Sequence, residues 1–258
     1  MLTIRPDQMQ VFREAAQLSF EESMVEHLAE FSPPLYAALG AAQMRKVVRF
    51  GVTRALRYEL TLRGPVRQYL ELMLMFGSHF DTDPQYAWAG NVLRDIKSGP
   101  QMARAERLFE KTMDYRRAVA GADDAHTLAA LHRVAELARR QYQFAPQQTE
   151  AAILDEIARI YPQKHDWLGE APLRALIAGA VKIARQNGLE RARDSVLMSV
   201  LMLAFGHGCC DDMLYQWIGR TLNDPAINGA EARSRRLEKK ALTWLRHVLG
   251  YFDAAVAS

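Results

Sequence analysis

Two short segments of the sequence gather side chains that can bind a metal ion. Divalent metals take imidazole, thiolate and carboxylate ligands, and all three kinds occur here. A metal ion at each turn, serving a metal-dependent enzyme, is therefore one hypothesis. The ligand candidates are His79, Asp81 and Asp83 in the first segment and His207, Cys209, Cys210, Asp211 and Asp212 in the second.

The two segments do not match in ligand type, which favours a structural role. When they are aligned, His79 is paired with a Gly and Asp81 with Cys210, so the acids shift register between them. Each segment also lies between a helix end, marked by Gly77 or Gly206, and a helix start, where aspartate is a favoured N-cap. We therefore predict helix capping at both turns, with no metal and no cofactor.

Familiar catalytic patterns are missing from the sequence. It contains no Gly-x-Ser-x-Gly nucleophile turn, no Gly-rich phosphate loop and no His-Glu-x-x-His pair. Neighbouring acids such as Asp123 and Asp124 are more simply explained as caps or solvated residues, because acid–base pairs come from two elements across a cleft. We predict a protein that is not an enzyme and has no catalytic residues.

The composition predicts a globular protein built of helices. Of 258 residues, 49% are apolar and 24% charged, while only 15 are Gly and 10 are Pro. No apolar run reaches the length of a membrane span, and no secretory signal is recognised at the N-terminus. The two cysteines are adjacent, at 209 and 210. Adjacent cysteines favour reduced thiols and a cytoplasmic location.

Apolar spacing and Gly or Pro signals predict the helices. The first helix should bury one face and end at 32–34, Ser-Pro-Pro, while Gly77 should end the third helix and Asp83 should cap the fourth. The buried face of the first helix is Met9, Phe12, Ala16, Phe20, Met24, Leu28 and Phe31. The expected helices are 6–31, 41–58, 64–76, 84–93, 100–119 and 126–142, with another starting at Pro146.

The order of residues repeats along the chain. The Leu-Gly at 39–40 recurs at 168–169, and the Tyr-x-Trp at 86–88 recurs at 215–217, each time at an offset of 129 residues. A constant offset without gaps predicts two tandem copies of one unit of roughly five helices. We expect an all-α fold packed into a helical bundle or repeat-like body. Residues 1–121 should form unit 1, and residues 122–258 a connecting helix plus unit 2.

The repeated turns and two basic helix faces are the candidate partner-binding surface. Paired Tyr and Trp side chains are frequent interface anchors, although the same pairs could fill each unit's core. Clustered arginines could meet an acidic protein or, as an alternative, nucleic acid, for which a net charge of +3 is small. The candidate partner-binding residues are Asp81, Asp83, Tyr86, Trp88, Asp211, Asp212, Tyr215, Trp217, Arg45, Arg49, Arg235 and Arg236.

The first turn also resembles a known group of sequences. The run Leu-Met-Leu-Met-Phe-Gly at 72–77, followed by Phe-Asp-Thr-Asp-Pro at 80–84 and by Trp88, is similar to all-helical bacterial proteins with a recurring Phe-Asp-x-Asp-Pro…Trp turn. Members are often encoded beside type VI secretion spike and toxin genes. The resemblance covers residues 35–115 well and 164–250 loosely. It implies an accessory protein that binds a secreted toxin or its delivery apparatus, as adaptor, chaperone or immunity protein; self-association is left open.

Overall fold

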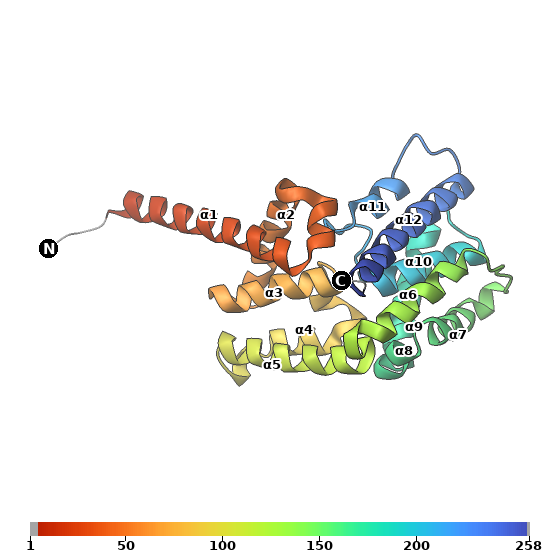
Figure 1. The fold of residues 1–258 in the computed structure, drawn as a ribbon, viewed down its shortest axis with the longest axis horizontal. Coiled ribbons are helices and arrows are strands. Elements are labelled where there is room, and N and C mark those ends of the chain that lie inside the picture. Colours follow the sequence, from red (N-terminus) through yellow and green to blue (C-terminus); the bar gives the residue numbers. More distant parts are fainter. Residues whose placement is uncertain (1–4, 257–258) are drawn as a thin grey trace.

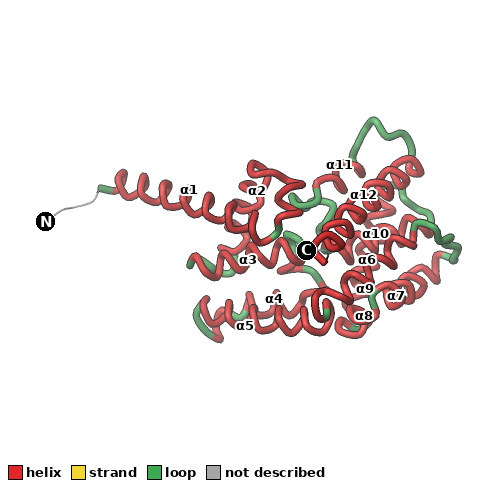
Figure 2. Tube along the Cα trace, in the orientation of Figure 1, coloured by secondary structure: helices red, strands yellow, loops and turns green. Residues whose placement is uncertain are grey.

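The structure, a computed structural model, describes residues 5–256. Within this range the chain forms helices and turns and no strand, so the predicted all-α fold class is confirmed (Figures 1 and 2). The α-helices are α1 (Pro6–Phe31), α2 (Pro33–Leu56), α3 (Arg63–Phe76), α4 (Ala87–Arg94), α5 (Gln101–Tyr115), α6 (Ala125–Leu137), α7 (Thr149–Ile160), α8 (Pro162–Leu168), α9 (Glu170–Gln186), α10 (Ala192–Phe205), α11 (Gln216–Leu222) and α12 (Ala230–Val256).

The helices form two groups that lie side by side (Figure 1). In the first group, α1 packs against α2 and α3, and α3 packs against α5. In the second group, α10 packs against α7, α9 and α12, and α6 lies against α12. Buried apolar side chains of both groups belong to one continuous core.

Helices α3 and α10 have matching bounds at the offset of 129. Both are 14 residues long. Each ends at a glycine with nearly the same backbone, φ 93° and ψ 153° at Gly77 and φ 90° and ψ 158° at Gly206. Residues other than glycine rarely adopt such positive φ angles. The predicted helix end at Gly77 is confirmed.

The second helix begins earlier than predicted. α1 ends at Phe31, as expected, but α2 starts at Pro33 instead of near residue 41. A proline in the first helical turn loses no hydrogen bond, because the first amides of a helix have no partner within it. α2 then bends at Gly40, whose φ is 74°. The break that the sequence suggested is therefore a kink inside one helix.

The first helix does not bury its whole apolar face. Met24 and Leu28 lie in the core, as predicted, but Met9 is 40% exposed and Phe12 is 63% exposed. Phe31 at the other end of the helix is also exposed. The prediction that one face is buried along the full length is wrong, because the N-terminal half of α1 extends beyond the helices against which it could pack (Figure 1).

Two further helices differ from their expected lengths. α5 ends at Tyr115, and a π-helical segment, Arg116–Ala120, continues to Gly121. α6 ends at Leu137, before the expected residue 142. Among the described residues, no helix is long and apolar enough to cross a membrane.

Candidate functional site: two interlocked turns and an apolar groove

The first turn holds Asp81 inside a polar cluster. The guanidinium of Arg54 on α2 donates to its carboxylate, and the hydroxyls of Tyr58 and Tyr69 donate to its Oδ2, each over 2.9 Å. Burial, followed by the hydrogen bond to Asp81, raises the pKa of Tyr58 to about 12. Asp81 is 2% exposed, so its carboxylate oxygens accept hydrogen bonds from groups of the protein and are not available to a partner.

The two turns are joined by a reciprocal pair of carboxylates. Asp83 accepts a hydrogen bond from the backbone N–H of His207 over 2.6 Å, and Asp212 accepts one from the backbone N–H of Ser78 over 2.8 Å. Each carboxylate also accepts from its own turn, Asp83 from Gln85 N–H and Asp212 from Leu214 N–H, both over 2.8 Å. The predicted capping role of Asp83 is confirmed, although the helix it caps is a short 3₁₀ turn, Pro84–Tyr86.

Two glycines allow the turns to approach so closely. A Cβ on Gly77 would lie 2.4 Å from the carbonyl oxygen of Phe205, and a Cβ on Gly206 would lie 2.9 Å from that of Phe76. Each glycine therefore ends a helix and also makes room for the helix end of the other group.

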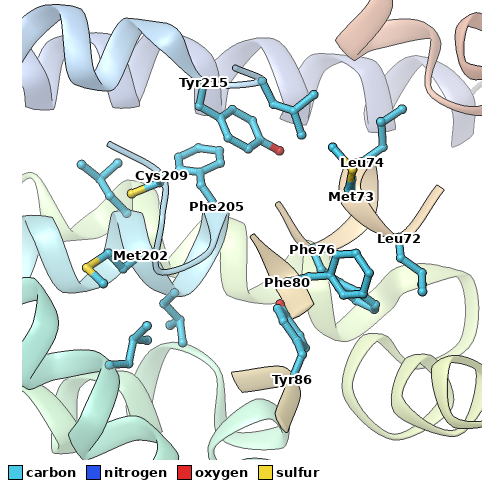
Figure 3. Close-up of a cluster of buried hydrophobic side chains, with 14 of the residues drawn as sticks. Leu72, Met73, Leu74, Phe76, Phe80, Tyr86, Met202, Phe205, Cys209 and Tyr215 are labelled. Carbon is cyan, nitrogen blue, oxygen red and sulfur yellow. The ribbon is translucent and has the colours of Figure 1, made fainter. Parts of the chain in front are cut away.

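Aromatic rings back each turn in the same arrangement (Figure 3). The ring centroids of Phe76 and Tyr86 are 4.4 Å apart, as are those of Phe205 and Tyr215. A third ring stands edge-on to each phenylalanine, 5.3 Å away for Tyr115 and 4.6 Å for Trp244. Such contacts stabilise a core beyond the area that they bury.

The structure separates the candidate partner-binding residues into inner and outer sets. Asp81, Asp83, Asp212, Tyr86 and Tyr215 are buried, so a partner cannot reach them in this fold. The prediction placed these five residues on a partner-binding surface. In the structure they are buried instead, because they make hydrogen bonds and ring contacts within the protein. Trp88 and Trp217 are half-buried, while Asp211 is exposed.

The arginines lie on the outside, on α2 and α12. Arg45 and Arg49 form ion pairs with Glu22 and Glu21 of α1. Arg235 pairs with Glu231 one helical turn away, and Arg236 is exposed. The candidate residues that remain available to a partner are therefore Asp211, the four arginines and the half-buried tryptophans.

An apolar groove that the sequence did not reveal lies between α6, α10 and α12. Its walls carry aliphatic and aromatic side chains, and Arg193 and Glu238 stand at its edge. A shallower hollow beside it shares that edge and adds Arg235, Lys239 and Arg246. Wall residues include Leu131, Val134, Val200, Ala204, Leu242 and Trp244.

Lys164 on α8 is a buried cation near the first turn. Its Nζ donates to the carbonyl oxygen of Leu203 over 2.9 Å and lies 3.4 Å from the hydroxyl of Tyr86. Burial lowers the pKa of Lys164 to about 8, an effect that the charge of Asp83 partly opposes. Sequence reasoning missed Lys164, since no residue pattern marks a lysine that becomes buried by the packing of distant helices.

The candidate metal ligands of the two turns have separate hydrogen-bond partners. The Nδ1 atom of His79 accepts a hydrogen bond from the guanidinium of Arg54 over 3.1 Å, and the His79 ring centroid lies 6.2 Å from that of His207. Cys209 is buried, and its pKa is raised by its hydrogen bond with Cys210 and by burial. Within residues 5–256, no three His, Cys, Asp or Glu side chains converge so that they could hold a metal ion.

Comparisons with other proteins place no further constraint on this site. No family model, no curated protein and no solved structure matches the chain.

Proposed function

We propose that this chain is a non-enzymatic, protein-binding accessory protein of a bacterial toxin-delivery system of the type VI secretion kind. The observation that carries the proposal is the apolar groove between α6, α10 and α12, with cations along one edge. By contrast, Asp81, Asp83 and Asp212 accept hydrogen bonds from groups within the fold. Binding is therefore assigned to the surface of the second group.

The groove, about 80 Å³ in volume, suits one or two apolar side chains of an amphipathic helix that carries acidic residues beside its apolar face. Helices bind in grooves through apolar side chains one turn apart, and opposite charge at the rim orients them and speeds association. Trp244 lines the groove, and tryptophan is a frequent contributor to such contacts. Arg235, Lys239 and Arg246 would face the acidic side of the bound helix.

The delivery-system role rests on the resemblance of residues 72–88 to proteins encoded near type VI secretion toxins. We propose a cytoplasmic adaptor or chaperone of a secreted toxin, or its immunity protein, as the two versions of this role. We also propose that the chain is a tandem duplication, with units 1–121 and 122–258. The matched helix ends at Gly77 and Gly206 and the reciprocal carboxylates support that second proposal.

The test is a pull-down of the products of neighbouring genes with the full-length chain and two variants. Ala204→Glu places a charge on the exposed wall of the groove, and Arg235→Glu reverses charge at its edge. Both should weaken capture at least about tenfold, equivalent to about 1.4 kcal/mol. Ala87→Glu, at an exposed alanine at the start of α4, is the matched control and should capture the partner normally.

Equal capture by all four proteins would rule out the groove as the binding site. Cells that express the captured toxin then separate the two versions of the role. An immunity protein restores growth by blocking the toxin, whereas an adaptor leaves the cells sensitive and is needed for export. Stoichiometric metal in the purified protein, or retention on heparin that weakens with salt, would support the enzyme or nucleic-acid alternative instead.

A further inference from the structure

The apolar groove is too small to receive the whole apolar face of a partner helix. Its volume is about 80 Å³, whereas a cavity of about 150 Å³ holds a single benzene ring. A helix bound in a groove inserts apolar side chains from successive turns, at positions such as i, i+3 and i+7. One of the three helices that form the groove must therefore move before a partner helix can bind along it.

Helix α6, which lies against α12, is loosely packed (Figure 1). Only one of its 13 residues, Ala130, is buried, whereas ten of the 14 residues of α10 are buried. The α6 side chains that line the groove, Leu131, Val134 and Leu137, are all half-buried. A helix with few buried apolar contacts opens locally at a lower free energy than the core does. We therefore expect α6 to be the wall that moves.

The N-terminal part of α6 follows a strained turn and is fixed to the end of α7. The hydroxyls of Thr127 and Tyr161 are 2.8 Å apart, and Arg133 donates to the last backbone carbonyl of α7 over 3.1 Å. Just before the helix, Asp123 and Asp124 have φ angles of 50° and 56°. Left-handed backbone at residues other than glycine costs free energy and is often found at switch regions. This turn is therefore the expected pivot of α6.

The C-terminal end of α6 is held by one side chain of α10. Arg193 donates to the carbonyl oxygens of Ala138 and Arg140, each over 2.9 Å, and forms an ion pair with Glu238 of α12. The Arg193 side chain is 32% exposed, so water can replace these bonds at a modest cost in free energy. The next α-helix begins only at Thr149, which gives this end of α6 enough free chain to swing outward.

The first group shows that a face of this kind stays packed without a covering helix. Under the proposed duplication, Phe109 and Met113 of α5 stand where Glu238 and Leu242 stand in α12, at the offset of 129. Phe109 is 59% exposed and Met113 is 38% exposed, so this face is largely open in the part of the chain that the structure describes. Helices α3 and α5 still pack against each other. We therefore expect α10 and α12 to stay folded when α6 moves away.

We propose that the C-terminal half of α6, residues 131–137, is a lid, and that the partner helix takes its place on α10 and α12. The inference rests on the proposed function, because it concerns the same groove. Opening of the lid uncovers an apolar surface that includes Val200, Leu242 and Trp244. A partner that binds only the open state shifts the equilibrium towards it, and the closed lid lowers the apparent affinity.

The lid itself indicates what the partner helix should look like. α6 presents Leu131, Val134 and Ala138 to the groove, which are positions i, i+3 and i+7 of one helix face. A helix that replaces the lid should carry apolar residues at the same spacing. Acidic residues beside that face would meet Arg235 and Lys239 at the rim.

The first test measures hydrogen–deuterium exchange of the full-length chain by mass spectrometry, without any ligand. The amides of residues 131–137 should exchange at least about tenfold faster than those of α10, because the lid opens without global unfolding. Arg193→Lys keeps the charge, but one ammonium group cannot span two carbonyls and a carboxylate, so it should speed this exchange about tenfold further. Arg174→Lys, at an exposed arginine paired with Glu150 and Glu170, is the matched control and should leave the exchange unchanged.

The second test asks which surface the opening uncovers. The probe is anilinonaphthalene sulfonate, a dye with fused aromatic rings and one negative charge that fluoresces when it binds apolar surface. Arg193→Lys should increase its fluorescence several-fold over the unmodified chain. Adding Ala204→Glu, which places a charge on the groove wall, should remove that increase.

Failure of the lid and failure of the proposed function give different results. Exchange of residues 131–137 that is no faster than that of α10, or that Arg193→Lys leaves unchanged, overturns the lid and leaves the groove as a binding site. Stronger capture of the partner by Arg193→Lys than by the unmodified chain, with weaker capture by Ala204→Glu, supports both. Equal capture by every variant, with fast exchange of the lid, overturns the proposed function and the assigned occupant, while the opening of α6 stands. Circular-dichroism melts confirm that each variant is folded.

Discussion

Asp83 and Asp212 each complete the turn to which the other belongs. They are 129 residues apart, both are buried, and each accepts a backbone amide of the opposite turn. A buried carboxylate that accepts several N–H groups is strongly stabilised, whereas the same amides left without an acceptor would cost free energy.

Replacing either carboxylate should therefore destabilise the whole protein. We expect Asp83→Asn and Asp212→Asn each to lower the free energy of unfolding by about 2 kcal/mol, because the amide offers a weaker acceptor and an NH₂ group in place of an oxygen. Urea titration followed by circular dichroism measures the change. Asp211→Asn, at an exposed position in the same turn, should change it by less than about 0.5 kcal/mol.

Three glycines should respond differently to substitution by alanine. Gly77 combines a φ of 93° with a clash at 2.4 Å, so Gly77→Ala should cost more than about 3 kcal/mol. Gly40 has a φ of 74° but open space, so Gly40→Ala should cost about 1 kcal/mol. Gly250 lies in the helical backbone of α12 with open space around it, and Gly250→Ala should stabilise the protein by up to about 1 kcal/mol. An equal effect at all three sites would contradict the backbone geometry and the surrounding space described for them.

The buried pair of Arg54 and Asp81 should show strong coupling. Asp81→Asn leaves the guanidinium without its counter-charge and should cost about 3–5 kcal/mol. Adding Arg54→Met removes the uncompensated charge, so the double variant should be less destabilised than the sum of the two single variants. A double-mutant cycle in urea measures this difference. Simple additivity would mean that the pair contributes no interaction of its own.

Lys164 should make stability rise with pH in a narrow alkaline window. Its pKa is lowered to about 8 in the folded protein, against 10.5 for an ordinary lysine, so the unfolded chain binds more protons between these values. Cys209 and several buried tyrosines, whose pKa values are raised by burial, lower stability over the same range. The contribution of Lys164 is therefore the difference in the free energy of unfolding between the unmodified protein and Lys164→Met, which should shift by about 2 kcal/mol in favour of the unmodified protein from pH 8 to pH 10. Above pH 10 the stability of both proteins should fall, because Tyr58 ionises near 12 in the fold but earlier when unfolded.

Urea titrations of both proteins at pH 8, 9 and 10 measure this difference. Lys164→Met removes the titrating group and keeps an aliphatic chain of similar length, so its stability should not increase over the same window. Parallel profiles for the two proteins would show that another group is responsible.

Local features of the fold were predictable, because their causes are local. Gly77 as a helix end and Asp83 as a cap follow from residue type and neighbours, and both are confirmed. The pairing of Asp83 with Asp212 was also visible in the sequence, because the two residues are 129 positions apart like the other repeated residues. The interpretation that the acids shift register is wrong for this pair, because the alignment was judged by Asp81 and the residues around it.

Features that depend on distant packing were not predictable. Arg54 lies among other basic residues of one helix, and only the turn that reaches it 27 residues later makes it a buried ion-pair partner. The groove forms because α6 lies against α12. The apolar periodicity of the sequence does not show which helices lie against each other. The exposed N-terminal half of α1 has apolar residues three or four apart, as its buried half does, so spacing alone could not show where the core ends.

The reciprocal hydrogen bonds between the two turns bear on the origin of the proposed duplication. An interface in which Asp83 serves the second turn and Asp212 serves the first has the form of a contact between twofold-related protomers. Under the proposed duplication, a single-unit ancestor would have completed its turn only by meeting its twin. Joining the two in one chain makes that encounter intramolecular, and its strength no longer depends on protein concentration. Under the same proposal, each copy would be able to vary its outer surface without losing the contact between the turns.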